Sequence, residues 1–260
     1  LCDNLYYSWT SASDNVPVKA MPSNYYTLSD NKITLNNVLM NGVEVSFTDA
    51  FFADPEALTS TYVIPLVMTG VTNADRILNG TLSEGAEAVR CNSSVWLVQP
   101  QDYVLYCVKY INKWTGKYLR HGVDKVTENG IVTENDRRNE YVEDDEICQT
   151  TTKSLTETIL TLTTNLGTAD NPRNIDYQLL LTFNGDDCAV SGLGGITATG
   201  TGKFVQDGEK NSWGNKDRDA IYLEYTVDFG NGLKFETEDT LVAHSRGVER
   251  EDFTPVYVKN

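Results

Sequence analysis

The chain has 260 residues, 40% of them hydrophobic and 10% aromatic, which is enough for one large β-domain or two of ordinary size. Its 21 basic and 37 acidic residues give a net charge of −16, which repels phosphate backbones and anionic membrane surfaces. We therefore expect no nucleic-acid partner. We also expect no transmembrane helix, because no apolar run reaches the roughly 18 residues that such a helix needs.

The first half of the chain is rich in short β-forming runs. They lie at residues 25–28, 33–35, 43–47 and 62–68, and turn formers such as Asn41-Gly42 separate them. Pro65 inside the last run favours an edge strand or a bulge there. Short strands at this spacing predict a β-sandwich. The pattern then weakens between residues 73 and 100, as expected for an interdomain connection.

The second half contains longer strand patterns, at residues 103–111, 155–166, 176–183, 196–205, 220–229 and 233–243. The polar, acidic stretch 123–146 is expected to contain a long loop. Two runs alternate strictly, and their apolar sides are Tyr177, Leu179, Leu181 and Phe183 in one run and Ile221, Leu223, Tyr225, Val227 and Phe229 in the other. Gly230-Asn231-Gly232 predicts a tight hairpin after the second run. Long strands joined by short turns predict an up-and-down barrel, and these bulky inward residues favour a filled one.

The five cysteines, Cys2, Cys91, Cys107, Cys148 and Cys188, include no C-x-x-C pair. A zinc or thioredoxin-like motif is therefore not supported, and we expect neither a metal site nor another cofactor. An odd count does not describe a disulfide framework, although one or two bridges stay open. Cys107 lies in an apolar run and is expected to be a buried free thiol.

No catalytic constellation stands out. The histidines are His121 and His244, and neither lies in the sequence context of a known nucleophile, such as G-x-S-x-G. Acid pairs for glycoside hydrolysis are inevitable among 37 acidic residues and therefore indicate little. The densest acidic groups, at residues 144–146 and 186–187, are interpreted as solvated loops, with a calcium site as the alternative. We expect a protein that is not an enzyme.

The segment 202–247 contains the most distinctive residues. Trp213 follows a polar loop and is a candidate ligand platform or, alternatively, a structural plug. Arg218 between two carboxylates predicts paired contacts that fix the loop to the barrel rim. The predicted structural tie consists of Asp217, Arg218, Asp219, Asp239 and Arg246.

Aromatic residues supply the remaining ligand-binding candidates. Trp114 and Tyr118 flank Gly116 in a motif that is expected to close one end of the barrel, with ligand contact as the less favoured role. Tyr222 lies on the polar side of the 220–229 strand and is a further candidate. Additional aromatic platforms for a sugar ring are Trp9, Tyr25 and Tyr26.

Several motifs together resemble one family of proteins. In the N-terminal half they are residues 21–29 (MPSNYYTLS), 51–55 (FFADP) and 62–66 (YVIPL); in the C-terminal half they are 109–119 (KYINKWTGKYL), 202–205 (GKFV), 213–219 (WGNKDRD) and 239–242 (DTLV). The chain is similar to exported surface lipoproteins of gut Bacteroidetes that accompany starch-utilisation-type glycan uptake systems. On this resemblance the N-terminal module lacks its first strands, and Cys2 falls inside the module, which disfavours it as the lipid anchor.

The resemblance implies an all-β fold in which an N-terminal immunoglobulin-like β-sandwich precedes a C-terminal antiparallel lipocalin- or calycin-like β-barrel. The expected domains are a sandwich at residues 1–85, a linker at 86–102 and a barrel at 103–260. The resemblance also implies export to the outer-membrane surface or the periplasm, with a lipid anchor in the precursor. It carries no catalytic residues.

Three functions follow as hypotheses. The leading one is a non-catalytic glycan-binding protein of a polysaccharide-acquisition system, with outer-membrane glycan-uptake proteins as partners. The first alternative is a lipid or small apolar ligand held inside the barrel, as the lipocalin-like fold implies. The second is a structural lipoprotein that docks to a protein partner. An exposed row of aromatic residues favours a glycan, whereas an empty apolar cavity favours a lipid.

Overall fold

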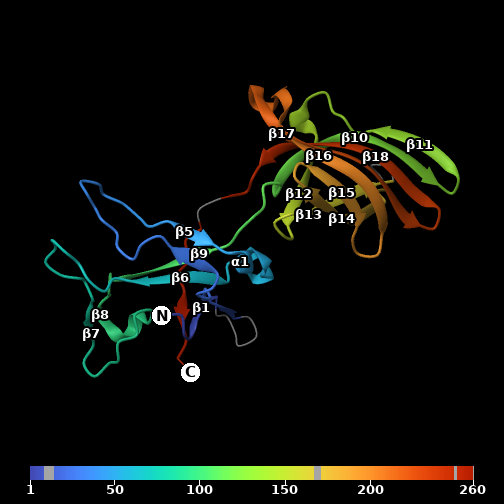
Figure 1. Cartoon of the computed structure of the whole chain (residues 1–260). Helices are drawn as coiled ribbons and strands as arrows, with labels where there is room; N and C mark the ends of the chain where they lie inside the picture. The colour runs from blue at the N-terminus through green and yellow to red at the C-terminus, as the bar shows by residue number, and fades with distance from the viewer. Residues whose placement is uncertain (9–14, 167–170, 249–250, 260) are drawn as a thin grey trace. The chain divides into compact units, whose positions relative to one another are not determined.

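A computed structural model describes residues 1–8, 15–166, 171–248 and 251–259, and it confirms the all-β fold class (Figure 1). The chain forms two compact units, one of residues 1–110 with 250–260 and one of residues 111–249. These boundaries differ from the predicted domain boundaries because strand β9 pairs with β6, and the C-terminal strand β19 pairs with β1. No helix in the described part of the chain is long and apolar enough to span a membrane.

The first unit consists of small sheets. Its strands are β1 (Leu5–Ser8), β2 (Val16–Pro17), β3 (Lys19–Ala20), β4 (Tyr26–Leu28), β5 (Val45–Phe47), β6 (Tyr62–Val67), β7 (Thr81–Leu82), β8 (Trp96–Val98), β9 (Tyr103–Val108) and β19 (Val256–Tyr257). Its helical turns are α1 (Asp49–Ala53), η1 (Pro55–Leu58) and η2 (Ser93–Val95). The sheets have the orders β19-β1-β2, β3-β6-β9, β4-β5 and β7-β8. The immunoglobulin-like arrangement of this part stays a prediction.

The second unit is a closed antiparallel barrel. Its strands are β10 (Gly116–Glu128), β11 (Ile131–Asp136), β12 (Glu146–Thr152), β13 (Glu157–Asn165), β14 (Asn174–Asn184), β15 (Asp187–Gly192), β16 (Thr197–Ser212), β17 (Lys216–Gly230) and β18 (Leu233–Ser245), with the short 3₁₀ helices η3 (Val142–Asp144) and η4 (Trp213–Asn215). Among the described strands, eight form the barrel in the order β10-β12-β13-β14-β15-β16-β17-β18, and β18 pairs with β10 to close it. Figure 1 follows these strands from green β10 to red β18.

Several segments differ from the sequence prediction, among them strands β12 and β15, which were not predicted. Residues 33–35 form no strand, and their apolar side chains are exposed. The stretch 123–146, expected to contain a long loop, instead holds the second half of β10 and all of β11 before a loop at residues 137–145. The strand pattern is hidden there because β11 is exposed throughout and because the inward residue Asp124 is charged.

Apolar residues fill most of the barrel interior. The alternating apolar sides of β14 and β17 point inward, as predicted, and join a cluster that includes Leu160, Leu162 and Leu241. The rings of Trp114 and Phe183 stack within it at 3.7 Å between centroids. The turn from β17 to β18 is also confirmed, because Gly230, Asn231 and Gly232 all have positive φ.

Charged residues form the remaining part of the interior. Asp239 of β18 accepts hydrogen bonds from Arg120 Nε at 3.0 Å, from Arg137 Nη2 at 2.5 Å and from the Tyr225 hydroxyl at 2.7 Å. Arg137 also pairs with Asp124, at 2.6 Å between Nε and Oδ2. Burial disfavours the charge on Arg120, but the combined attraction to Asp239 and to the nearby Tyr225, Tyr177 and Glu146 outweighs it and raises the pKa of Arg120 well above its ordinary value. Each buried charge therefore has a partner of opposite sign.

Candidate functional site

The outer wall of the barrel carries two parallel rows of polar side chains across β16, β17 and β18. In the first, which we call the lysine row, Lys203 lies opposite Tyr222, and Tyr222 lies opposite Thr240. The members of the second, which we call the glutamate row, are Thr201, Glu224 and Glu238, also opposite one another in register. Because a strand rises about 3.4 Å per residue, rows two residues apart are separated by about 7 Å.

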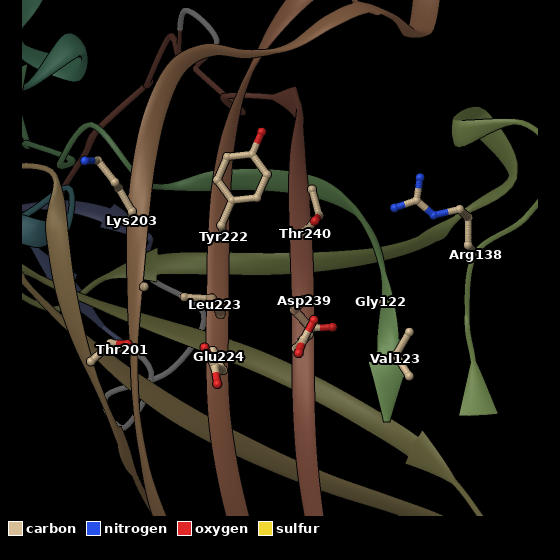
Figure 2. Close-up of a pocket in the computed structure, with 12 residues that line it drawn as sticks. Gly122, Val123, Arg138, Thr201, Lys203, Tyr222, Leu223, Glu224, Asp239 and Thr240 are labelled. Carbon is tan, nitrogen blue, oxygen red and sulfur yellow. The ribbon is translucent and has the colours of Figure 1, made fainter. Parts of the chain in front are cut away.

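A surface pocket of about 470 Å³ lies over these rows, and we call it the wall pocket. All six members of the two rows line it, together with Arg138 and Val123. Figure 2 shows Lys203, Tyr222 and Thr240 side by side, with the side chain of Arg138 extending from the loop after β11 toward Thr240. The pocket is therefore bounded by the barrel wall and by this loop.

The loop that carries Arg138 is fixed at both ends. The backbone N–H of Arg137 donates to the carbonyl oxygen of Gly122 at 2.9 Å, and the N–H of Asn139 donates to Asp145 at 2.9 Å. Asp145 in turn lies 2.7 Å from Nδ1 of His121, and both side chains are buried. Gly122 permits close contact of β10 with β18, because an added Cβ would collide with the carbonyl oxygen of Glu238. Arg138 is thus held beside the pocket by its neighbours.

Three charged side chains of the wall pocket have no partner among the described residues. Arg138, Glu224 and Glu238 make no side-chain hydrogen bond or ion pair there, although Glu224 and Glu238 are directly opposite each other. Like charges at opposed positions on neighbouring strands destabilise a sheet. Lys203 has only a long ion pair, at 3.8 Å from the exposed Asp187. The pocket therefore holds hydrogen-bonding groups that the fold itself does not use.

Tyr222 is the aromatic residue at the centre of the wall pocket. Its hydroxyl donates to Oε1 of Glu209 at 2.8 Å, which fixes the orientation of the ring. Partial burial, followed by this hydrogen bond to a carboxylate, raises the pKa of Tyr222 to about 12. The side chain is only partly buried, so the ring is accessible in the pocket. Of the aromatic residues proposed from the sequence, Tyr222 lies in the wall pocket.

Two other predicted ligand residues lie in the core instead. Trp114 and Tyr118 are 4% and 2% exposed, and the Tyr118 hydroxyl donates to the carbonyl oxygen of Trp114 at 2.7 Å. Such burial prevents either ring from stacking on a ligand at the surface, so their proposed role in ligand binding has to be corrected. The indole of Trp114 packs against Phe183, and its Nε1 has no partner among the described residues.

Trp213 is fixed by contacts within the second unit. The guanidinium carbon of Arg218 lies 3.5 Å from the centroid of the indole, and the ring of His244 stacks on the indole at 4.9 Å. The indole Nε1 donates to the carbonyl oxygen of Ala243 at 3.0 Å. These contacts occupy much of the ring, which leaves less of it for a ligand.

The five residues of the predicted structural tie form separate contacts among the described residues. Arg218 bonds the carbonyl oxygen of Trp213, whereas Arg246 bonds the carbonyl oxygens of Asn112 and Lys113. Asp217 accepts from Lys210 and from the N–H of Asn211, and Asp219 accepts from the N–H of Asp207. Asp239 is inside the barrel. Each residue thus stabilises its own segment.

The remaining aromatic candidates belong to the first unit. Tyr25 packs in a core cluster there, and its hydroxyl donates to Asp54 at 3.0 Å, while Tyr26 lies partly buried beside the same cluster. Trp9 lies outside the described residues. The dense acidic groups are also engaged, because Asp145 contacts His121 and Asp186 pairs with Lys113. Among the described residues, no group of three or more His, Cys, Asp or Glu is arranged to hold a metal ion.

Sequence reasoning missed most members of the wall pocket. Alternation along 220–229 does place Tyr222 and Glu224 on one side of a strand. The strand register, which the sequence does not reveal, adds Lys203 and Glu238 to that side. Arg138 was not predicted as a site residue, because the stretch 123–146 was expected only to contain a long loop.

The fold and this site define the class of the protein: an all-β protein whose barrel carries a polar pocket on its outer wall. The chain belongs to the family of the domain of unknown function DUF5627, whose model matches residues 113–247. A second model, described as an N-terminal domain, matches residues 3–75.

Two solved structures are similar to the chain to different degrees. A crystal structure of a protein of unknown function from Bacteroides ovatus is 41% identical, with a TM-score of 0.87, over 99% of this chain and 81% of that chain. An auxiliary nutrient binding protein from Bacteroides thetaiotaomicron is 13% identical, with a TM-score of 0.34, over 87% of this chain and 70% of that chain. The second likeness is too low to carry an argument. No curated protein matches the chain.

Proposed function

We propose that the protein is a non-catalytic glycan-binding protein and that the wall pocket is its binding site. The observation that carries the proposal is an accessible tyrosine ring, Tyr222, set among charged and hydroxyl side chains that lack partners in the described chain. Sugars present an apolar ring face and a rim of hydroxyl groups. An aromatic ring with convergent polar groups matches both features.

The polar groups are suited to hydroxyl recognition. Glu224 and Glu238 accept hydrogen bonds only, and Thr201 and Thr240 both donate and accept. A sugar lying on Tyr222 has hydroxyl groups within reach of both rows, because the rows are separated by about 7 Å along the strands. Binding would place donors from the ligand between the two carboxylates and reduce their mutual repulsion.

The same residues support binding rather than hydrolysis. Glycoside hydrolysis needs one carboxyl group that its environment keeps protonated next to an ionised partner. Glu224 and Glu238 are both exposed to solvent in an open pocket. His121 is buried beneath the loop that contains Asp145, which gives it an orienting partner but no open face toward a substrate.

The alternative of an apolar ligand inside the barrel is less favoured. Side chains such as Leu179, Leu181 and Ile221 are fully buried against one another within the barrel. The other part of the interior holds the paired charges of Arg120, Arg137 and Asp239. An apolar ligand would have to displace packed side chains or lie against these charges, and both are costly.

We infer that the protein acts outside the cytoplasm, at the outer-membrane surface or in the periplasm, as part of a polysaccharide-acquisition system. Support comes from the resemblance to exported proteins of glycan uptake systems and from a family relative in Bacteroides ovatus. Lipid anchoring of the precursor and contact with outer-membrane glycan-uptake proteins belong to the same proposal.

A glycan array with the purified chain tests the proposal, followed by calorimetry on each positive glycan. Tyr222→Ala should weaken binding by roughly tenfold or more, because aromatic residues at the centre of a site dominate the binding energy. Tyr106→Ala is the matched control, since Tyr106 is 56% exposed and lies in the first unit. Binding that is equal in the two variants would move the site elsewhere. A blank array would instead favour the docking hypothesis.

A further inference from the structure

The wall pocket has hydrogen-bonding groups of opposite kinds on its two sides. The lysine row begins at Lys203 and ends at Thr240, beside Arg138. Lysine and arginine side chains only donate hydrogen bonds. The glutamate row contains Glu224 and Glu238, which only accept. A ligand that satisfies the pocket must therefore present acceptors at one end and donors at the other.

Arg138 is the less engaged of the two cations. Lys203 has its ion pair with Asp187, whereas the guanidinium of Arg138 has no partner among the described residues. Its chain neighbour Arg137 contacts two carboxylates in the same barrel. An arginine guanidinium binds a carboxylate through two parallel hydrogen bonds, and this geometry is stronger and more specific than contact with a hydroxyl group.

We propose that the wall pocket selects a saccharide that carries a carboxylate, such as a hexuronic acid residue, and this inference rests on the proposed glycan-binding function. In a hexuronic acid the carboxylate and the hydroxyl groups of carbons 2 and 3 lie at opposite ends of one ring. With the ring on Tyr222, the carboxylate faces Arg138 and the hydroxyl of Thr240, and the ring hydroxyl groups donate to Glu224 and Glu238. A neutral hexose leaves Arg138 without an ionic partner.

The net charge of −16 limits how acidic the ligand is. A densely charged polyuronate would be repelled by the protein as a whole, since charges act over about 10 Å at 0.1 M salt. A single carboxylate held near Arg138 interacts mainly with that guanidinium. The expected ligand is therefore an isolated acidic residue within an otherwise neutral glycan.

The test uses an array of matched oligosaccharide pairs that differ only in whether one hexose is replaced by the corresponding hexuronic acid, in the gluco, galacto and manno series. We expect the acidic member of at least one pair to bind roughly tenfold or more tightly at low salt, with the advantage reduced at high salt. Arg138→Gln should abolish that advantage, so that the acidic and the neutral member of the pair bind the variant equally. Arg173→Gln, which removes an exposed guanidinium paired with Glu128, is the control.

The outcomes separate the two proposals. If both members of every bound pair bind equally, or if Arg138→Gln leaves the preference intact, the acidic-saccharide inference fails while glycan binding stands. If no pair binds, or if Tyr222→Ala leaves all binding unchanged, the proposed function of the wall pocket fails and the inference fails with it.

Discussion

Charged side chains are paired on the inner side of the barrel wall, whereas most of those in the wall pocket on its outer side have no partner among the described residues. Arg137 and Arg138 are adjacent in sequence, as are Glu238 and Asp239. On the inner side, Arg137 and Asp239 pair at 2.5 Å, and the side chain of Asp239 is fully buried while that of Arg137 is mostly buried. On the outer side, Arg138 and Glu238 line the wall pocket without partners among the described residues.

The difference shows how position decides what a charged residue does. A buried charge is costly unless it is paired, so each inner residue requires its neighbours and is unavailable to a ligand. An outer charge remains hydrated and costs little when unpaired, so it is free to bind. The opposed carboxylates on the outer side even reduce stability slightly. Residues that lower stability in this way are expected at sites where a residue serves binding and not folding.

The largest expected effect comes from breaking the inner network. Asp239→Ala removes the acceptor of Arg120, Arg137 and Tyr225, and we expect the free energy of unfolding to fall by about 3–5 kcal/mol. Urea denaturation measures it. Glu238→Ala, on the adjacent outer position, should change stability by only about 0.5 kcal/mol. Equal losses in the two variants would contradict the contrast between the two sides.

The inner side should also make the protein sensitive to alkali. Burial raises the pKa of the Cys148 thiol from 9.0 to about 12. The unfolded thiol loses its proton above about pH 9 while the folded one keeps it, so stability should fall between pH 9 and 12, by about 1.4 kcal/mol per pH unit. Unfolding curves across this range, compared between the wild type and Cys148→Ala, isolate the contribution. Parallel pH dependences would show that the thiol is not responsible.

An intermediate effect on stability is expected at the end of the β16–β17 hairpin. The arginine there contacts an aromatic ring, whereas the arginines of the inner network contact carboxylates. Arg218→Ala removes the guanidinium that stacks on Trp213 and bonds its carbonyl oxygen. We expect a loss of about 1–2 kcal/mol from these contacts. Tryptophan fluorescence during denaturation reports it, with Lys216→Ala as an exposed neighbour for control. An unchanged midpoint would mean that Trp213 is held by other contacts alone.

The smallest expected effect has the opposite sign. Glu238→Gln removes one of two directly opposed carboxylates, so we expect the protein to be stabilised by about 0.2–1 kcal/mol. The same change should weaken binding of any glycan that binds the wall pocket, because a charged acceptor is lost. Thermal denaturation and calorimetry measure the two quantities. A Glu238→Gln variant that is less stable than the wild type, or that binds as tightly, would contradict the idea that outer carboxylates serve binding and inner carboxylates serve stability.

The sequence predicted the fold best where apolar alternation is uninterrupted. Strands β14 and β17 and the turn at Asn231 follow directly from their patterns, because one side of each strand must be buried. The second half of β10 was not predicted, because a charged residue such as Asp124 is usually exposed in a loop, whereas here it is buried in a strand. The cost of burying Asp124 is offset by its contacts with Arg137 and Thr237. Neither partner is near Asp124 in the sequence.

The candidate site divides in the same way. Tyr222 was proposed from its place on the polar side of a strand and lines the wall pocket, whereas Trp114 and Tyr118 were proposed as ligand residues and lie in the core. The local sequence does not distinguish an aromatic side chain in the core from one in a surface pocket. Which of them is accessible depends on the packing of Phe183 and its neighbours, and local sequence does not determine that packing.

The sequence by itself determined the all-β class, the inward apolar sides of the longest strands and the negative net charge, because these follow from periodicity and composition. The tertiary structure alone decided the register that sets Lys203, Tyr222 and Thr240 in one row, and the loop that brings Arg138 beside them. Register and loop position arise from hydrogen bonds and ion pairs between residues far apart in the chain. A pattern read along the chain does not contain those pairings.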